Sequence, residues 1–216
     1  SWGSSEMRHT RLPICGGNND APAYFVDALK AGARFGVIAS SDDHATLPGS
    51  VNHFRTPPYS LPFVNGFAHK GLAAVRAPRL TRAALFEAMQ RRSTYATTHV
   101  RSLLDFSIAD AGMGQAVAAD AALRRRRELR LRLTLQTTKQ ACVTLMRNGE
   151  AVDVRKLQGP AVTDSVNEIV FEDVEPLETV ALRDAPYHPA PFAVYYIRVE
   201  DGTGAHQWTS PIWIDL

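Results

Sequence analysis

The stretch Glu128–Gln136, ELRLRLTLQ, alternates apolar and polar residues without a break. Its apolar side holds four leucines: Leu129, Leu131, Leu133 and Leu135. Its polar side holds Arg130, Arg132 and Thr134. Successive side chains of a strand point to opposite faces, so this period of two predicts a β-strand with one buried face and one face in water.

Seven segments rich in β-forming residues, separated by turn residues, follow residue 101. They are LLDFSIA from Leu103, ELRLRLTLQ, ACVTLMR from Ala141, EAVDVRKL from Glu150, NEIVFEDVE from Asn167, FAVYYIRVE from Phe192 and HQWTSPIWID from His206. Asn148-Gly149 joins two of them and favours the tight turn of a β-hairpin. The run Arg124–Arg127 is expected to be a solvated loop before a strand rather than a phosphate contact. No helix is expected among these strands, and their spacing predicts a β-sandwich of immunoglobulin-like type.

Residues 1–101 have a different pattern, in which helix and strand signals alternate. Helices are predicted from the apolar spacing of Tyr24–Leu29 and of Leu80–Arg92, the second with Thr81 as N-cap and with Leu85, Phe86 and Met89 lining one face. Strands are predicted for FGVIAS (35–40), GLAAVRA (71–77) and STYATT (93–98). FGVIAS is apolar enough for a strand covered on both faces, as in a parallel sheet. The sequence therefore predicts an α/β domain over residues 1–101 and an all-β domain over residues 102–216.

The composition is that of a folded protein with balanced charge. Of the 216 residues, 45% are hydrophobic and 21% are charged, and the formal net charge is +2. We expect no nucleic-acid partner, because a strong basic field is lacking. No stretch is apolar for long enough to span a bilayer. The two cysteines, Cys15 and Cys142, are far apart in sequence and do not indicate a compartment.

Residues suited to metal chemistry follow FGVIAS directly, in the sequence Ser41-Asp42-Asp43-His44. In α/β proteins, functional side chains collect at the C-terminal ends of buried strands. Alternate residues of an extended segment point the same way, so Asp42 and His44 would project together. A carboxylate beside an imidazole suits Zn²⁺, Mn²⁺ or Fe²⁺, and Ser40 or Ser41 would supply a hydrogen bond that orients the carboxylate. Two alternatives remain open: a capping Asp beside a surface His, and an Asp–His hydrogen bond without a metal.

The sequence IASSDDHATLPG, residues 38–49, resembles the last metal-binding motif of the PHP (polymerase and histidinol phosphatase) superfamily. Further stretches resemble a large bacterial PHP-like family: WGSSE, GLAAVRAPRLTRAALFEAMQRRSTYATT, LLDFSIADAGMG, VTLMRNGEAV and YYIRVEDGTGAHQWTSPIWID. The resemblance covers nearly the whole chain. It implies the C-terminal portion of a distorted α/β barrel followed by a β-sandwich, within a longer protein.

Carried over to this chain, the resemblance implies that Asp42 and His44 are metal ligands. The full-length protein would then be a hydrolase with two or three divalent ions (Zn, Mn or Fe), acting on a small phosphoester substrate through a metal-activated water. Glu6, Ser41 and His99 are candidates for orienting a ligand or contacting substrate. For Glu6 a structural salt bridge or helix cap is the alternative, and for His99 an exposed position at a strand end. No residue is assigned as catalytic.

The H-x-H motif that opens such a barrel is expected upstream of Ser1. The missing N-terminal portion is therefore an expected partner, and the isolated chain is expected to be inactive. A periplasmic or secreted location would require a signal peptide in that portion. The alternative function is a non-catalytic binding or scaffolding protein in which the β-sandwich is the functional module, and a third is carbohydrate binding by the aromatic residues of the sandwich.

Overall fold

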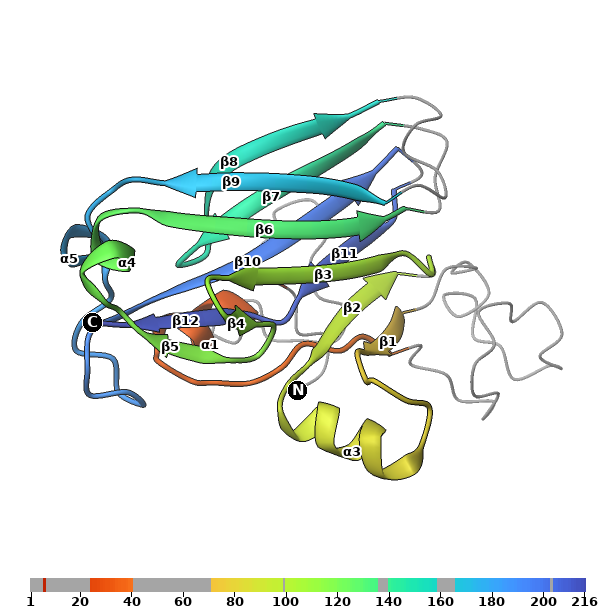
Figure 1. Ribbon diagram of the computed structural model, residues 1–216, viewed down its shortest axis with the longest axis horizontal. Coiled ribbons are helices and arrows are strands. Elements are labelled where there is room, and N and C mark those ends of the chain that lie inside the picture. Colours follow the sequence, from red (N-terminus) through yellow and green to blue (C-terminus); the bar gives the residue numbers. More distant parts are fainter. Residues whose placement is uncertain are drawn as a thin grey trace, which may run out of the picture.

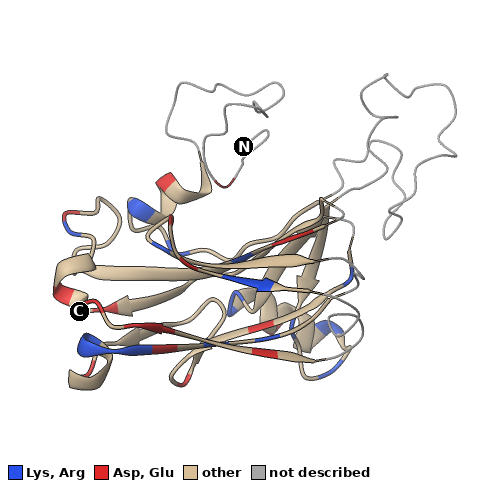
Figure 2. Ribbon diagram, turned by 90° about the horizontal axis from the view of Figure 1, so that it is seen from above, with Lys and Arg blue, Asp and Glu red and all other residues tan. Residues whose placement is uncertain are grey.

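The computed structural model describes residue 6 and residues 24–40, 71–98, 100–135, 140–158, 166–202 and 204–216. Twelve strands in this part form two sheets that lie in two layers (Figures 1 and 2). Basic and acidic residues are interleaved along the strands of both layers (Figure 2). A β-sandwich architecture is therefore confirmed. The immunoglobulin-like type and the α/β barrel stay predictions.

The larger sheet has eight strands. They are β1 (Gly71–Val75), β2 (Thr94–Thr98), β5 (Ala116–Ala118), β7 (Ala141–Arg147), β8 (Glu150–Leu157), β10 (Phe192–Asp201), β11 (His206–Thr209) and β12 (Ile212–Asp215). The main path runs β1-β2-β11-β10-β12-β5, and β7 joins β10 to β8. Neighbouring strands are antiparallel, except for the parallel pair β12 and β5.

The smaller sheet has four antiparallel strands in the order β4-β3-β6-β9. They are β3 (Leu103–Ile108), β4 (Ala111–Gly112), β6 (Arg127–Thr134) and β9 (Asn167–Asp173). The predicted alternation in β6 is confirmed, because Leu129, Leu131 and Leu133 are buried while Arg130 and Arg132 are exposed. These leucines pack against residues of β7, β10 and β12, so the main core lies between the two sheets.

Strand β10 is buried on both of its faces. Tyr195 and Ile197 point into the main core, whereas Val194 and Tyr196 point to the opposite, outer face of the eight-stranded sheet. On that outer face they pack with residues of, and following, the helix α1 (Phe25–Lys30). The outer face therefore has a small core of its own, which holds α1 and Phe35 against the sheet.

The Asn148-Gly149 hairpin is confirmed between β7 and β8. Both residues have positive φ, 53° for Asn148 and 84° for Gly149, which is the requirement of a type I′ turn. The Asn148 side chain also accepts a hydrogen bond from Val194 N at 3.0 Å and donates one to Val180 O at 2.7 Å. The two residues thus fit the backbone geometry of the turn, and the Asn148 side chain also attaches the turn to the sheet.

Helices are present in the second half, so the prediction of an uninterrupted run of strands was wrong. They are α4 (Ala121–Arg125) and α5 (Leu177–Val180). Asp120 caps α4 by accepting a hydrogen bond from Leu123 N at 2.7 Å. HQWTSPIWID forms two strands, because Ser210 and Pro211 separate β11 from β12. None of the helices that the structure describes has the length and hydrophobicity that crossing a bilayer requires.

In the first half, the helix α3 (Arg82–Gln90) is confirmed with Thr81 as its N-cap, and β1 and β2 occupy predicted strand positions. The apolar face predicted for α3 is not the buried one, because Ala84 and Ala88 are the buried residues and Phe86 and Met89 are exposed. Alanines let the helix axis approach the sheet more closely than the larger side chains would.

The segment FGVIAS is not a strand in the structure, which corrects a second prediction. Its Val37 N–H donates to Ser210 Oγ at 2.8 Å instead of to a neighbouring strand, and Ile38 is 63% exposed. The segment therefore lies on the sheet without joining its hydrogen-bond ladder. The domain boundary at residue 101 stays a prediction, although β2 pairs with β11 across it.

A buried ion cluster links the two sheets. The carboxylate of Asp173, at the end of β9, contacts Arg127 at 3.0 Å, Arg147 at 2.9 Å and the Tyr195 hydroxyl at 2.8 Å. Arg127 belongs to the small sheet, whereas Arg147 and Tyr195 belong to the large one. The Arg127 side chain is fully buried, so the prediction of a solvated loop was wrong for this residue. Its buried position is possible because Asp173 and backbone carbonyls, including Leu123 O, accept hydrogen bonds from its two Nη atoms.

Substitution of Asp173 by Asn is expected to lower the free energy of unfolding by about 3–5 kcal/mol, because it leaves the Arg127 charge buried without its counter-ion. Urea denaturation measures this loss. The matched control is Glu172→Gln, which breaks only an exposed pair with Arg126 and should cost less than about 1 kcal/mol. Equal losses in the two variants would show that the cluster does not hold the sheets together.

The same carboxyl gives stability a defined pH dependence. Burial alone would raise the pKa of Asp173, but hydrogen bonds from Arg147 and Tyr195 and the charge of Arg127 outweigh it and lower the pKa below its ordinary value. The contribution of Asp173 is therefore complete above the unfolded-state pKa of about 3.9 and is lost as the pH falls through the lower folded-state value. In the Asp173→Asn variant, the free energy of unfolding should no longer fall over the pH range in which Asp173 becomes protonated. Urea denaturation at several pH values measures this.

Candidate functional site

Of the residues that sequence reasoning singled out, Glu6 lies in the part of the chain that the structure describes. Ser41, Asp42, His44 and His99 lie outside the described residues, and their roles stay predictions. Glu6 has a described position on the fold. The described residues nearest in sequence to Asp42, those up to Ser40, show where that motif begins.

The Glu6 carboxylate lies on the outer face of the eight-stranded sheet and is held by three donors. The Tyr196 hydroxyl donates to Oε1 at 2.6 Å, and Arg198 and Trp208 Nε1 donate to Oε2 at 3.1 and 2.9 Å. The Glu6 side chain is only 9% exposed. Its backbone carbonyl also accepts a hydrogen bond from Val26 N at 3.0 Å, next to the start of α1.

These donors converge because of strand geometry. Tyr196 and Arg198 are two positions apart on β10 and share one face, and Trp208 on β11 lies directly opposite Arg198. Trp208 is held in turn by stacking with His206, with ring centroids 5.7 Å apart and planes 14° from parallel. Burial and the adjacent Glu6 carboxylate raise the pKa of Tyr196, which keeps its hydroxyl protonated as a donor.

Glu6 therefore forms the salt bridge that was the alternative reading of this residue. Both of its oxygens accept hydrogen bonds from protein groups, so its observed role is to fix residue 6 to β10 and β11. Contact with a metal or a substrate stays a prediction. Sequence reasoning did not identify Tyr196, Arg198 and Trp208 as its partners. The alternation in FAVYYIRVE placed the first two on one face, but nothing local pointed to a carboxylate 190 residues away.

The segment 33–40 leads from α1 towards Ser41 along the same outer face. Arg34 ties its start to the sheet through an ion pair with Asp215 and a contact to His188 Nε2 at 2.8 Å. Gly36 passes so close to β2 that a Cβ there would lie 2.9 Å from Thr94 Oγ1. The Val37 N–H is bound by Ser210, whose hydroxyl is also 3.0 Å from Thr94 Oγ1.

The segment ends against the first residue of β1. A Cβ on Gly71 would lie 2.5 Å from Ser40 O and 2.9 Å from Ser40 N, so the two backbones are in direct contact. Gly71 pairs with Thr98, at the other end of the β1–β2 pair from Thr94. Residues 36–40 therefore run the length of this strand pair, and Ser40, two positions before Asp42, has a fixed position at the edge strand of the sheet.

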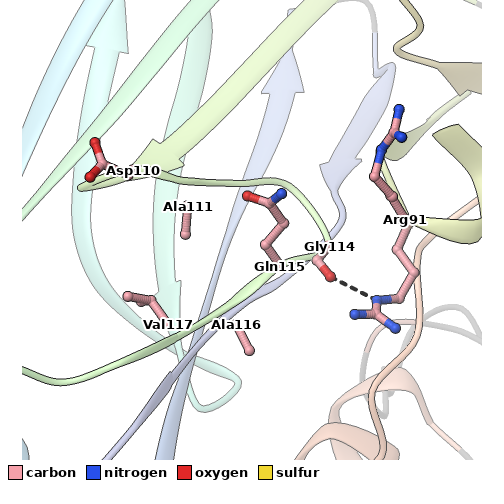
Figure 3. A pocket seen from close by; sticks show the side chains of 8 residues that line it. Arg91, Asp110, Ala111, Gly114, Gln115, Ala116 and Val117 are labelled. Atoms are coloured by element: carbon pink, nitrogen blue, oxygen red, sulfur yellow. Dashed lines mark hydrogen bonds between the residues drawn. The ribbon is translucent and has the colours of Figure 1, made fainter.

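A separate pocket of about 440 Å³ opens where the end of α3 meets the β3–β4 and β4–β5 turns (Figure 3). It is lined by Arg91, Arg92, Asp110, Ala111, Gly114, Gln115, Ala116 and Val117. Arg92 Nε donates to Gly114 O at 2.7 Å, and its guanidinium lies 5.7 Å from the centre of the Trp213 ring. Arg92 thus joins α3 to the sheet, and the pocket contains no His or Cys ligand. Within the described ranges no group of three or more His, Cys, Asp and Glu side chains could hold a metal ion.

Comparison with known proteins gives a family match and three long relatives. Residues 60–124 match the model of a family described as "Protein of unknown function (DUF3604)", and the eight pocket residues fall within this range. Uncharacterized proteins of Chlamydia pneumoniae and of Chlamydia trachomatis serovar D are 32% and 33% identical over 223 and 227 residues. A third, from Chlamydia muridarum, is 31% identical. Each alignment covers 100% of this chain and 33% of the relative.

This chain thus spans about a third of the length of the curated relatives that it matches. Among solved structures, the crystal structure of an engineered protein aligns with 54% of this chain and 20% of its own, at 13% identity and a TM-score of 0.29. A likeness this weak carries no argument about fold or function.

Removal of the Glu6 carboxylate should destabilise the protein. Glu6→Ala leaves three donors on the outer face without their acceptor, and we expect a loss of about 2–4 kcal/mol in the free energy of unfolding. Denaturation curves of the variant and its control measure the loss. The control is Glu200→Ala, whose carboxylate is 60% exposed and 3.8 Å from His206, and which should cost less than about 1 kcal/mol. A Glu6→Ala variant as stable as the control would rule out the anchoring role.

A side chain at position 71 should displace Ser40. Because the atoms that a Cβ would meet belong to the Ser40 backbone, Gly71→Ala cannot be relieved by a rotamer change and should cost about 1–3 kcal/mol. Gly112→Ala is the control, since its Cβ would meet only Gln115 Oε1 at 3.8 Å. Thermal unfolding compares the two, and a midpoint for Gly71→Ala at or above that of Gly112→Ala would contradict the close contact.

Proposed function

We propose that this chain is part of a metal-dependent hydrolase that acts on phosphoesters, with Asp42 and His44 as metal ligands. One observation supports this most directly. Ser40, the residue before Ser41-Asp42-Asp43-His44, is held by backbone contact with Gly71 at the edge of the eight-stranded sheet. Two side chains can act together on one cation only if the backbone that carries them starts from a defined place.

The position of Glu6 supports the same proposal. Glu6 is held over β10 and β11, and Ser40 over β1, on the same face of the same sheet. Strands β11 and β1 are two strand spacings apart, about 10 Å. Two of the stretches that resemble the PHP-like family, WGSSE and the D-x-H motif, are therefore adjacent to points on the sheet that lie close together.

The side chains of Asp42, His44 and Ser41 define how this chain would bind the ion. Asp42 would bind the cation through a hard carboxylate oxygen and His44 through an imidazole nitrogen, a combination that fits Zn²⁺, Mn²⁺ or Fe²⁺. Ser41 would hydrogen-bond the carboxylate and fix its orientation. A bound divalent ion would supply Lewis-acid chemistry for phosphoester hydrolysis. The remaining ligands would come from other parts of a longer polypeptide, since this chain aligns with only 33% of its relatives.

The test compares three variants of the complete gene product. Hydrolysis of a generic phosphoester is followed as Mn²⁺ or Zn²⁺ is titrated. Asp42→Asn and His44→Ala should each lower the rate of hydrolysis by more than the roughly 10–100-fold that results from mutating residues that only hydrogen-bond a metal ligand. Asp43→Asn is the matched control, since Asp43 would project away from the other two, and it should keep its activity within about threefold. Equal rates in all three would reject the ligand assignment, and an inactive but folded wild-type protein would favour the non-catalytic alternative.

A further inference from the structure

The helix α3 has one apolar face against the sheet and a second apolar face in solvent. Ala84 and Ala88 are 8% and 0% exposed. Phe86 and Met89 are 56% and 50% exposed, and Leu80, just before the helix, is 92% exposed. At 100° per residue, Leu85, Met89 and Phe86 follow one another around the helix, next to the buried alanines. The apolar residues of α3 therefore extend beyond its buried stripe, with Arg82 between Met89 and Phe86, so the helix has more apolar surface than its contact with the sheet covers.

Strand β1, which precedes α3 in the chain, is an edge strand of the described part of the eight-stranded sheet. Strand β1 is the last in the order β1-β2-β11-β10, and no strand that the structure describes pairs with its other side. Helix α3 is the connection between β1 and β2 and lies beside them, outside the two stacked sheets (Figure 1). An open strand edge and an uncovered apolar helix face are the two kinds of surface that proteins cover with further structure.

The charges around the helix narrow the choice of partner. Arg79, Arg82 and Arg91 are exposed on or beside α3, and Glu87 is the acidic residue among them, 3.7 Å from Arg91. A second copy of this chain would bring one basic rim against another, which is unfavourable. A nine-residue helix is about 14 Å long, shorter than many helices that lie in a membrane interface. An apolar protein surface with an acidic rim fits best.

We propose that the exposed face of α3 and the free edge of β1 bind another region of the same polypeptide, outside residues 1–216, which presents apolar side chains with acidic neighbours. The length of the relatives supports this source, because the whole of this chain aligns with only 33% of each. The proposal does not depend on Asp42 or His44, and it would hold for a catalytic or a non-catalytic protein.

Hydrogen exchange of the backbone amides tests the proposal. The 216-residue chain is compared with the complete gene product under the same conditions. Amides of residues 71–75 and 82–90 should exchange about tenfold more slowly, or slower still, in the complete product. Amides of β8 are the internal control, because this strand is also a sheet edge, with Val152 and Val154 exposed. Their exchange should not change.

Paired variants identify the side chains responsible. Phe86→Ser with Met89→Ser should lower the denaturation midpoint of the 216-residue chain only slightly, because each side chain is at least half exposed in it. In the complete product the same pair should abolish the added protection of residues 82–90. The matched control on β8 is Val152→Ser with Val154→Ser. It should change neither the denaturation midpoint of the 216-residue chain nor the protection of residues 82–90 in the complete product.

Four results would overturn the proposal. The first is equal exchange of residues 71–75 and 82–90 in the two proteins, and the second is a gene product no longer than 216 residues. The third is protection of α3 that rises with the concentration of the 216-residue chain, which would assign the surface to a second copy. The fourth is protection that requires vesicles of phosphatidylglycerol, which would assign it to a membrane.

Discussion

The carboxylate of Asp173 is the interaction on which the arrangement of the two sheets depends. It receives Arg127 from one sheet and Arg147 and Tyr195 from the other. A buried ion cluster stabilises little by itself compared with apolar packing, but it penalises any arrangement that separates its members. Apolar side chains can slide past one another with small loss, whereas a charge withdrawn from its partner cannot. Asp173 therefore fixes which residues of β7 and β10 face β6 and β9.

The position of β10 carries this constraint to the other side of the molecule. Tyr195 and Tyr196 are neighbours in a strand, so they point to opposite faces. Tyr195 donates to Asp173 between the sheets, and Tyr196 donates to Glu6 on the outer face. Burial raises the pKa of both hydroxyls, and each lies beside a carboxylate that raises it further. The dipeptide Tyr195-Tyr196 thus connects the buried ion cluster of Asp173 with the site that binds Glu6.

Sequence reasoning succeeded where structure is set by local pattern. The alternation of β6 and the Asn148-Gly149 turn were confirmed because each depends on residues within a few positions. The burial of Arg127 and of Glu6 could not be predicted, since their partners are 46 and 190 residues away in sequence. For α3, the helical spacing of apolar residues predicted the helix, but it could not predict which face is buried, because that depends on how the helix packs against the sheet. The ligands Asp42 and His44 stay predictions, supported by the position of Ser40.

Gly71 connects the catalytic proposal with the docking proposal. It is the first residue of β1, so its backbone belongs to the free edge of the sheet, and its Cα lies against Ser40, from which the D-x-H motif continues. A polypeptide region that added a strand to β1 would lie about 4.8 Å from it, on the strand whose first residue contacts Ser40. Two protein ligands rarely hold a catalytic ion, since such sites use three or more. A region docked on β1 would therefore be well placed to supply the missing ligands, and in that case docking and metal binding would be coupled.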